Sequence, residues 1–229
     1  LTAVAAILIG WRLLGPGSLT GGAMPRLDVG FGEALGRVLG LHDDAGLGSR
    51  TPADPLLTVL LVWSLPFLGH LDFAVRVLFL LALPAAALLA YASTSRLTPR
   101  PSIRALLALV WAGAPAFVLS LVEGRIGAVV AWLVLPVCVR ALHSAISRRS
   151  IEASAAAGLL LAVVCAGMPV LLLPAAVLVV VFVVRTHALR LLWSLVPLLA
   201  LTGPWLVAAV RQPDALLTDP GAVLPYPVA

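Results

Sequence analysis

FAVRVLFLLALPAAALLAYA, residues 73–92, is a run of twenty residues that carries a single charge, Arg76. A helix of about twenty apolar residues is long enough to cross the roughly 30 Å hydrocarbon core of a bilayer. The apolar residues are continuous and do not alternate with polar ones, which favours a transmembrane helix over a barrel strand. This run therefore predicts one full membrane crossing.

Further apolar segments follow along the chain. Residues 105–122 and 126–142 are predicted to span, and so is the stretch 191–210, with a kink or interruption at Gly203-Pro204. Residues 153–184 form a run of 32 residues, which is too long for one upright helix. Since Gly167-Met168-Pro169 lies at the middle of this run, two short helices with a tight turn are expected there.

The composition of the whole chain agrees with a membrane protein. It is 62% hydrophobic and 11% charged, with a mean hydropathy of +1.11, whereas soluble domains carry about a quarter charged residues. The net charge is +5 and every basic residue is Arg. Because these arginines sit in short links between apolar runs, they are expected to orient helices in a bilayer, and no nucleic-acid partner is expected.

We therefore predict an all-α fold, a polytopic transmembrane helix bundle in the plasma membrane, surrounded by membrane lipids. Because the chain begins at Leu1 inside an apolar helix and ends at Ala229 just after a Pro-rich stretch, we expect a fragment of a longer polypeptide. The predicted organisation is a single transmembrane domain over residues 1–229, with a polar loop (15–54), a helical bundle (55–210) and a polar tail (211–229).

The long polar segment of the chain is LTGGAMPRLDVGFGEALGRVLGLHDDAGLGSRTPADP, residues 19–55, which holds five of the ten acidic residues. Between Leu27 and Leu41 its apolar side chains recur at i, i+3 and i+4. This spacing predicts an amphipathic helix that lies on the membrane surface. The apolar positions are Leu27, Phe31, Ala34, Leu35, Val38 and Leu39.

The side of the membrane on which this loop lies stays open at the level of sequence. Three basic links carry eight arginines and are assigned to the cytoplasm. If residues 55–69 and 73–92 both cross, the loop is cytoplasmic as well. If residues 55–69 enter and leave on one side, the loop is extracytoplasmic. We favour the second arrangement, because a 15-residue helix of about 22 Å is short for a crossing.

Three stretches carry a resemblance to known proteins: LTGGAMPRLD, LHDDAGLGSRTPADPLLTVL and the VEGRIG turn. They resemble the membrane region of actinobacterial proteins that fuse a family-2 glycosyltransferase domain to a polytopic C-terminal part. A polar first loop ending in Gly-x-Gly-x-x-x-Pro before a helix is also similar to C-type membrane glycosyltransferases. That family uses polyprenyl-phosphate-linked sugars on the outer face. The resemblance covers most of the 229 residues.

The resemblance implies site residues as well. The first-loop acids of the family would fall on Asp28 and on Asp43 or Asp44, and its second external turn on Glu123-Gly124-Arg125. The sequence departs from the fusion proteins because the soluble family-2 domain, with its Asp-x-Asp signature, is absent. Asp43 and Asp44 are adjacent, not spaced. Nucleotide-sugar chemistry would then belong to a cytoplasmic glycosyltransferase domain elsewhere in the same polypeptide.

The loop acids suggest acid–base chemistry. Asp28, Asp43 or Asp44 would act as a general base on an acceptor hydroxyl, while an arginine or a divalent cation holds the lipid phosphate. His42 beside them is a candidate ligand for phosphate or metal. The competing interpretation is that these acids are solvated in a wet loop or cap the surface helix.

Glu123 and Arg125 lie between two apolar spans, where ionisable residues are costly and often functional. Arg125 could clamp a phosphate bidentately, or it could snorkel and pair with Glu123. The same alternative holds for Arg76, which has Asp72 as a helical neighbour at i−4. Cys138 and Cys165 lie in apolar segments and are expected to be buried thiols.

Three functions remain open. The first is a membrane glycosyltransferase region that transfers a sugar from a polyprenyl-phosphate donor to a cell-envelope glycan or lipid. The second is a non-catalytic membrane module that anchors a cytoplasmic glycosyltransferase domain or moves its lipid-linked product. The third, ordinary secondary transport, has less support, because the spans hold few polar residues and no clear inverted repeat.

Overall fold

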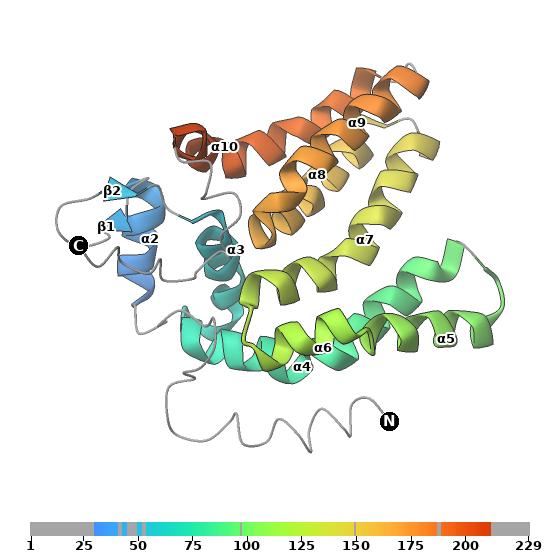
Figure 1. Cartoon of the computed structure of the whole chain (residues 1–229), viewed down its shortest axis with the longest axis horizontal. Helices are drawn as coiled ribbons and strands as arrows, with labels where there is room; N and C mark the ends of the chain where they lie inside the picture. The colour runs from blue at the N-terminus through green and yellow to red at the C-terminus, as the bar shows by residue number, and fades with distance from the viewer. Residues whose placement is uncertain are drawn as a thin grey trace.

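The computed structural model describes residues 30–40, 43–44, 50–51, 54–96, 98–148, 150–186 and 189–211. Helices make up most of these residues, which confirms the predicted helical bundle (Figure 1). One departure from an all-α fold is a small antiparallel ladder of β1 (Asp43–Asp44) and β2 (Arg50–Thr51). The α-helices are α2 (Phe31–Gly40), α3 (Pro55–Ser64), α4 (Leu71–Ser93), α5 (Pro101–Ala112), α6 (Pro115–Val122), α7 (Ile126–Arg148), α8 (Ile151–Gly167), α9 (Leu172–Thr186) and α10 (Leu195–Arg211).

Two stretches of the described chain are long and apolar enough to cross a membrane, Leu71–Arg96 and Ile126–Ser147. They correspond to α4 and α7, so the spans predicted over residues 73–92 and 126–142 are confirmed as helices. Helix α7 continues past the predicted end as far as Arg148. A third crossing results if α5 and α6 are taken together as one broken span.

The segment predicted to span over residues 105–122 is divided between two helices. Helices α5 and α6 are separate and meet at an angle of 42°. Pro115 starts α6, and a proline disfavours helical geometry at the residue before it. Stacked rings pack beside this break: the ring of Trp132 lies 4.6 Å from that of Trp111 and 5.9 Å from that of Phe117.

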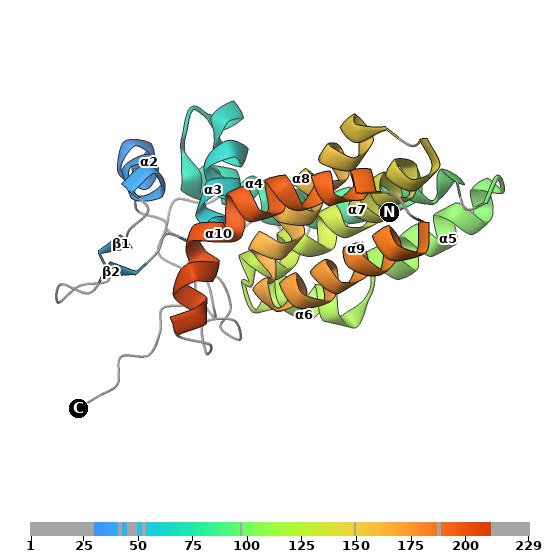
Figure 2. The ribbon, with the colours of Figure 1, turned by 90° about the horizontal axis from the view of Figure 1, so that it is seen from above.

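The hairpin predicted within residues 153–184 is confirmed. Helix α8 ends at Gly167, Met168 leaves the helical region with φ −139° and ψ 86°, and a 3₁₀ turn over Pro169–Leu171 leads into α9. The predicted kink in the last helix also agrees with the structure. Helix α10 bends in its C-terminal part (Figure 2), and its straight apolar stretch ends at Gly203.

The long helices pack in series: α4 against α7, α7 against α8, and α8 against α10. Helices α7 and α8 approach each other closely, since a Cβ added to Gly127 would lie 2.4 Å from the carbonyl oxygen of Gly167, and the reverse distance is also 2.4 Å. Small residues allow such approach of two backbones in membrane bundles. A similar contact joins Gly158 of α8 to Ser194, which ends the 3₁₀ helix Leu189–Ser194.

The bundle has two chemically different ends (Figure 1). We call the first the loop end; it carries α2, the β1–β2 ladder, the turn between α3 and α4, and the Glu123–Arg125 turn. We call the second the arginine end; it is formed by the C-terminal ends of α4, α7 and α9. At this end Arg104 donates to the carbonyl of Tyr91 from 3.1 Å and Arg140 donates to that of Ala92 from 3.1 Å.

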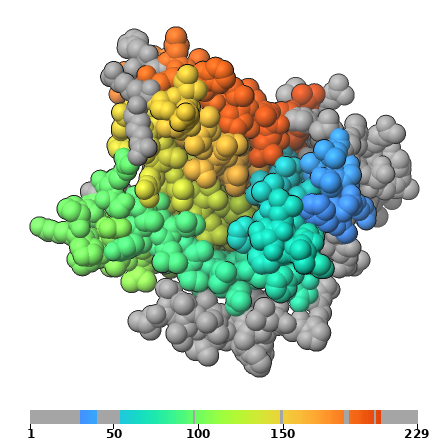
Figure 3. All heavy atoms as spheres, turned by 180° about the vertical axis from the view of Figure 1, so that it is seen from behind, coloured from blue at the N-terminus to red at the C-terminus, as the bar shows by residue number. Residues whose placement is uncertain are grey.

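Helix α5 projects from the side of the bundle at the arginine end, as the green region of the space-filling view shows (Figure 3). It packs on α4 and exposes most of its apolar side chains, including Leu106 at 61% and Val110 at 64%. Ala108 and Ala112 are buried against the rest of the protein. An exposed apolar helix face of this kind fits contact with lipid.

Candidate functional site

The loop end is built on the turn between α3 and α4. Leu68 (φ 56°) and Gly69 (φ 79°) both adopt left-handed backbone geometry there. The amide of Gly69 donates to the carbonyl of Ser64 from 3.0 Å and that of Leu68 to Leu65 from 3.2 Å. This pair of bonds is the Schellman arrangement that ends a helix, usually with Gly in the position that Leu68 takes.

Helix α2 docks on this turn. A Cβ added to Gly69 would lie 2.8 Å from the ring of Phe31, so the contact requires glycine. Ala34 is fully buried, and Phe31 and Val38 pack against the same core. The predicted amphipathic helix is therefore present, but its inner face rests on the bundle. Leu35 (38% exposed) and Leu39 (73% exposed) remain as an outer apolar edge.

Helix α3 forms the first part of the apolar segment over residues 55–69, which is short for a membrane crossing. Asp54 caps it by accepting a hydrogen bond from the amide of Leu56 at 2.8 Å, and Pro55 occupies its first turn. Its 10 residues correspond to about 15 Å, half the thickness of a bilayer core. Asp54 is thus a helix cap, a role that was not predicted for it from the sequence.

The structure describes only some of the other candidate residues of the polar loop. Asp28 and His42 lie outside the residues that the structure describes. The backbone of Asp43 and Asp44 forms β1, in which Asp43 lies opposite Thr51 and Asp44 opposite Arg50. The ladder formed by these two strands also contacts α2 through β1.

The Glu123–Arg125 turn is a second Schellman arrangement. The amide of Arg125 donates to the carbonyl of Ser120 from 2.9 Å, and Gly124 takes the left-handed position with φ 72°. This geometry brings Nε of Arg125 to 2.5 Å from Oε2 of Glu123. The two side chains stay open to their surroundings, at 45% for Arg125 and 37% for Glu123. The turn leads directly into Gly127, which contacts Gly167.

A further ion pair joins Arg76 to Asp72 in the first turns of α4, with 2.6 Å between Nη2 and Oδ2. Only 13% of the Arg76 side chain is exposed, so it lies along the protein and not out in solvent. Helical side chains point toward the N-terminus, which directs this guanidinium to the loop end. The i, i+4 spacing in the sequence was the signal for this pair.

Aromatic side chains surround the α3–α4 turn. The indole nitrogen of Trp63 donates to the carbonyl of Ala74 from 2.9 Å. The ring of Phe67 lies 6.0 Å from that of Trp63 and 5.6 Å from that of Phe73. Trp63 and Phe73 are partly exposed, as expected of aromatic residues at a membrane interface.

Together these contacts give the loop end exposed carboxylates and guanidinium groups beside an aromatic rim. An exposed guanidinium such as that of Arg125 is suited to bind a phosphate or a carboxylate. Within the described ranges, no group of three His, Cys, Asp or Glu side chains is arranged to hold a metal ion. A divalent cation therefore has no preformed protein site among these residues.

No family model matches the chain, and no curated protein or solved structure matches it. The function is therefore argued from the charged residues at the two ends of the bundle and from the resemblance noted in the sequence.

Proposed function

We propose that the chain is the membrane-embedded region of a glycosyltransferase, which transfers a sugar from a polyprenyl-phosphate donor to a cell-envelope glycan or lipid. The observation that carries the proposal is the position of β1, with Asp43 and Asp44, at the same end of the bundle as the Glu123–Arg125 turn (Figure 1). The arginine end lies opposite. The positive-inside rule then assigns the loop end of this multi-pass protein to the outer face of the plasma membrane.

Each residue of the proposed site has a stated role. The Arg125 guanidinium binds the donor phosphate, and Glu123 orients that guanidinium through the 2.5 Å ion pair. Asp28, Asp43 or Asp44 removes the proton from the acceptor hydroxyl, and His42 assists in binding phosphate. A divalent cation recruited by these carboxylates and the donor phosphate would neutralise the same charge.

The test is release of free polyprenyl phosphate when the full chain in proteoliposomes is given polyprenyl-phosphate-linked hexoses and pentoses together with a cell-envelope glycan or lipid whose hydroxyl accepts the sugar. Arg125→Lys keeps the charge but loses the bidentate geometry, so the rate is expected to fall about tenfold or more. Asp43→Asn or Asp44→Asn, whichever removes the base, is expected to lower it about 100-fold or more. Arg37→Lys is the matched control, because Arg37 also pairs with a neighbouring acid, Glu33, at the loop end.

A second candidate, the non-catalytic membrane module, is favoured by the ion pairs themselves. Glu33–Arg37, Asp72–Arg76 and Glu123–Arg125 each join residues of one helix or turn. Such local pairs stabilise structure without any substrate. If no donor releases polyprenyl phosphate and Arg125→Lys behaves like Arg37→Lys, the glycosyltransferase proposal fails and the module takes its place.

A further inference from the structure

The turn between α3 and α4 presents large apolar side chains outward. Val62 is 63% exposed, Leu65 is 58% exposed and Leu68 is 89% exposed. From Pro55 to Leu71 the chain carries no Asp, Glu, Lys or Arg. A turn that lies in water is usually built from polar residues and glycine. An apolar surface on a turn is therefore of the kind that meets a partner.

Leu68 holds backbone geometry that suits glycine, with a φ of 56°. A residue with a Cβ is strained in this geometry. In water, a leucine that is 89% exposed buries too little apolar surface to offset the strain. Glycine would reverse the chain at this point without strain. A leucine here therefore indicates that its side chain makes a contact beyond the turn.

The polar backbone groups of the turn are bonded within the protein. The amides of Leu68, Gly69 and His70 each donate to a carbonyl that lies just before them in the chain, from 3.2, 3.0 and 3.1 Å. Pro66 has no amide hydrogen to satisfy. Backbone can enter lipid only where its polar groups are bonded internally. The α3–α4 turn meets this requirement.

The turn also lies at the level where a membrane begins. The indole nitrogen of Trp63 donates to the carbonyl of Ala74 from 2.9 Å, which joins the end of α3 to the first turns of α4. The rings of Phe67 and Phe73 lie 5.6 Å apart beside this bond. Aromatic side chains gather where hydrocarbon meets the headgroups. Since α4 is long and apolar enough to cross a membrane, lipid is the partner at this level.

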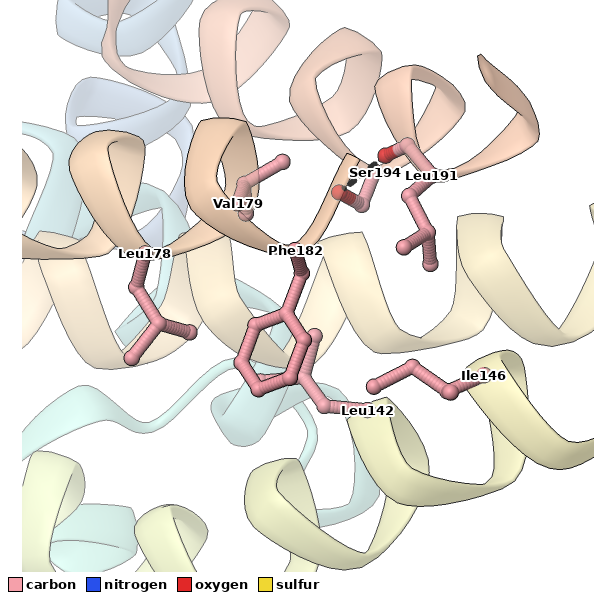
Figure 4. Close-up of a pocket in the computed structure, with 7 residues that line it drawn as sticks. All are labelled: Leu142, Ile146, Leu178, Val179, Phe182, Leu191 and Ser194. Carbon is pink, nitrogen blue, oxygen red and sulfur yellow. Dashed lines mark hydrogen bonds between the residues drawn. The ribbon is translucent and has the colours of Figure 1, made fainter. Parts of the chain in front are cut away.

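The shallow groove toward the arginine end offers no comparable contact (Figure 4). It encloses about 10 Å³, roughly the room that one water molecule needs. Ser194, the polar side chain among its lining residues, already donates to the carbonyl of Leu191 from 2.6 Å. The side chains of this groove are packed against one another, whereas those of the α3–α4 turn project outward.

We propose that the α3–α4 turn inserts into the membrane surface, with Leu65 and Leu68 among the acyl chains just below the headgroups. The expected depth is about 5–10 Å, as for the apolar face of an interfacial helix. Helix α2 docks on this turn through Phe31 and Gly69, and β1 contacts α2. The inserted turn therefore fixes the height of α2 and the β1–β2 ladder above the bilayer (Figure 1). Nothing in the proposal depends on glycosyltransferase activity.

The experiment places an environment-sensitive fluorophore on Leu68→Cys in the full chain, with Cys138 and Cys165 replaced by alanine, in proteoliposomes. Quenching is measured with lipids that carry a doxyl group at the fifth or the twelfth acyl carbon, and with iodide in the water. We expect the doxyl group at the fifth carbon to quench most and iodide least. Glu33→Cys is the matched control, because the side chain of Glu33 is 63% exposed at the same end; iodide is expected to quench most there.

A second variant tests whether the leucine itself is the anchor. Asn accepts left-handed geometry better than other residues with a Cβ except Asp, so Leu68→Asn keeps the turn and removes the apolar side chain. With the fluorophore on Leu65→Cys, this variant is expected to lose lipid quenching and gain quenching by iodide. Unchanged quenching at Leu65 would overturn the role of Leu68.

Two results at Leu68→Cys would overturn the proposal outright. Quenching by iodide as strong as at Glu33→Cys would put the turn in water. Protection from both iodide and the doxyl lipids would show that protein covers it, either a second copy of the chain or another part of the same one.

Discussion

At the scale of single residues, the loop end depends on backbone geometry that most side chains avoid. Leu68 holds a φ of 56° although it is 89% exposed. For a residue with a Cβ, this left-handed geometry costs roughly 1–2 kcal/mol. Leu68 adopts this geometry at the point where the chain reverses direction between α3 and α4. The next residue, Gly69, has no side chain and so leaves space for the ring of Phe31.

Leu68→Gly is therefore expected to stabilise the protein by about 0.5–1 kcal/mol, the relief of strain minus the added entropy of the unfolded chain. Thermal unfolding in detergent, followed by circular dichroism, measures the change. The control is Leu65→Gly, since Leu65 is also exposed but has helical φ and ψ of −54° and −45°. That substitution is expected to lower stability by about 1 kcal/mol, and a loss of stability for both would contradict the strain argument.

At the scale of elements, helix α8 is held by backbone contacts with its neighbours. Gly127 meets Gly167 on α7 and α8, and Gly158 meets Ser194 beside α10. A methyl group at any of these glycines would meet backbone atoms, which cannot turn aside as a side chain can. The packing of α7 and α8 thus fixes the turn that carries Glu123 and Arg125.

Gly127→Ala is expected to destabilise the bundle by about 1–3 kcal/mol, because the new Cβ would lie 2.4 Å from the carbonyl oxygen of Gly167. The midpoint of thermal unfolding reports this loss. Gly203→Ala serves as the comparison, since a Cβ there would meet no atom within 4 Å and alanine favours the helix by up to about 1 kcal/mol. Equal midpoints for the two variants would show that the α7–α8 contact is looser than described.

The sequence predicted the helices more accurately than the contacts between them. Length and unbroken apolar character were enough to predict α4, α7 and the α8–α9 hairpin, because a membrane core imposes both. The bend between α5 and α6 was missed, although Gly113 and Pro115 marked it. The Gly127–Gly167 contact could not be predicted, because small residues are frequent in every segment and spacing along the chain does not say which ones meet.

At the candidate site, too, the sequence predicted local contacts but not contacts between separate elements. Glu123 and Arg125, which are two positions apart, interact through a local turn, so their pairing could be given as one alternative from the sequence Glu-Gly-Arg alone. Whether separate elements bring β1 and the Glu123–Arg125 turn to the same end of the bundle depends on how the helices pack, which no local pattern encodes. The role of Asp54 as a cap was visible, since Asp before Pro at a helix start is a common signal.

At the scale of the whole molecule, the length of α3 bears on the side of the membrane that the proposal gives to the loop end. Its 10 residues cannot carry the chain through a full bilayer core. In Figure 1, α3 stays at the loop end and α4 then runs to the arginine end. Helix α2 and the β1–β2 ladder therefore lie at the opposite end of the bundle from the C-terminal ends of α4, α7 and α9, which is the arrangement that the proposed transfer at the outer face needs.

This arrangement is tested with single cysteines in a chain in which Cys138 and Cys165 are replaced by alanine. A membrane-impermeant thiol reagent is expected to label Ser49→Cys on intact cells, and Ser102→Cys, at the start of α5, only after lysis. The two cysteines removed are buried and would react poorly in any case. Labelling in the reverse order would put the polar loop in the cytoplasm and end the proposal of transfer at the outer face.

The arginine bond between α7 and α4 also bears on biosynthesis. Arg140 donates to the carbonyl of Ala92, a residue that the ribosome adds 48 positions earlier. The last carbonyls of a helix have no partner within the helix itself. At the end of α4, however, the hydroxyl of Thr94 donates to the carbonyl of Tyr91 from 3.1 Å and that of Ser95 donates to the carbonyl of Ala92 from 2.8 Å. These carbonyls therefore have local donors as soon as the chain reaches Ser95, before Arg104 or Arg140 is made. We expect the end of α4 to form on its own during synthesis, and the bond from Arg140 to be added later, when α7 packs against α4.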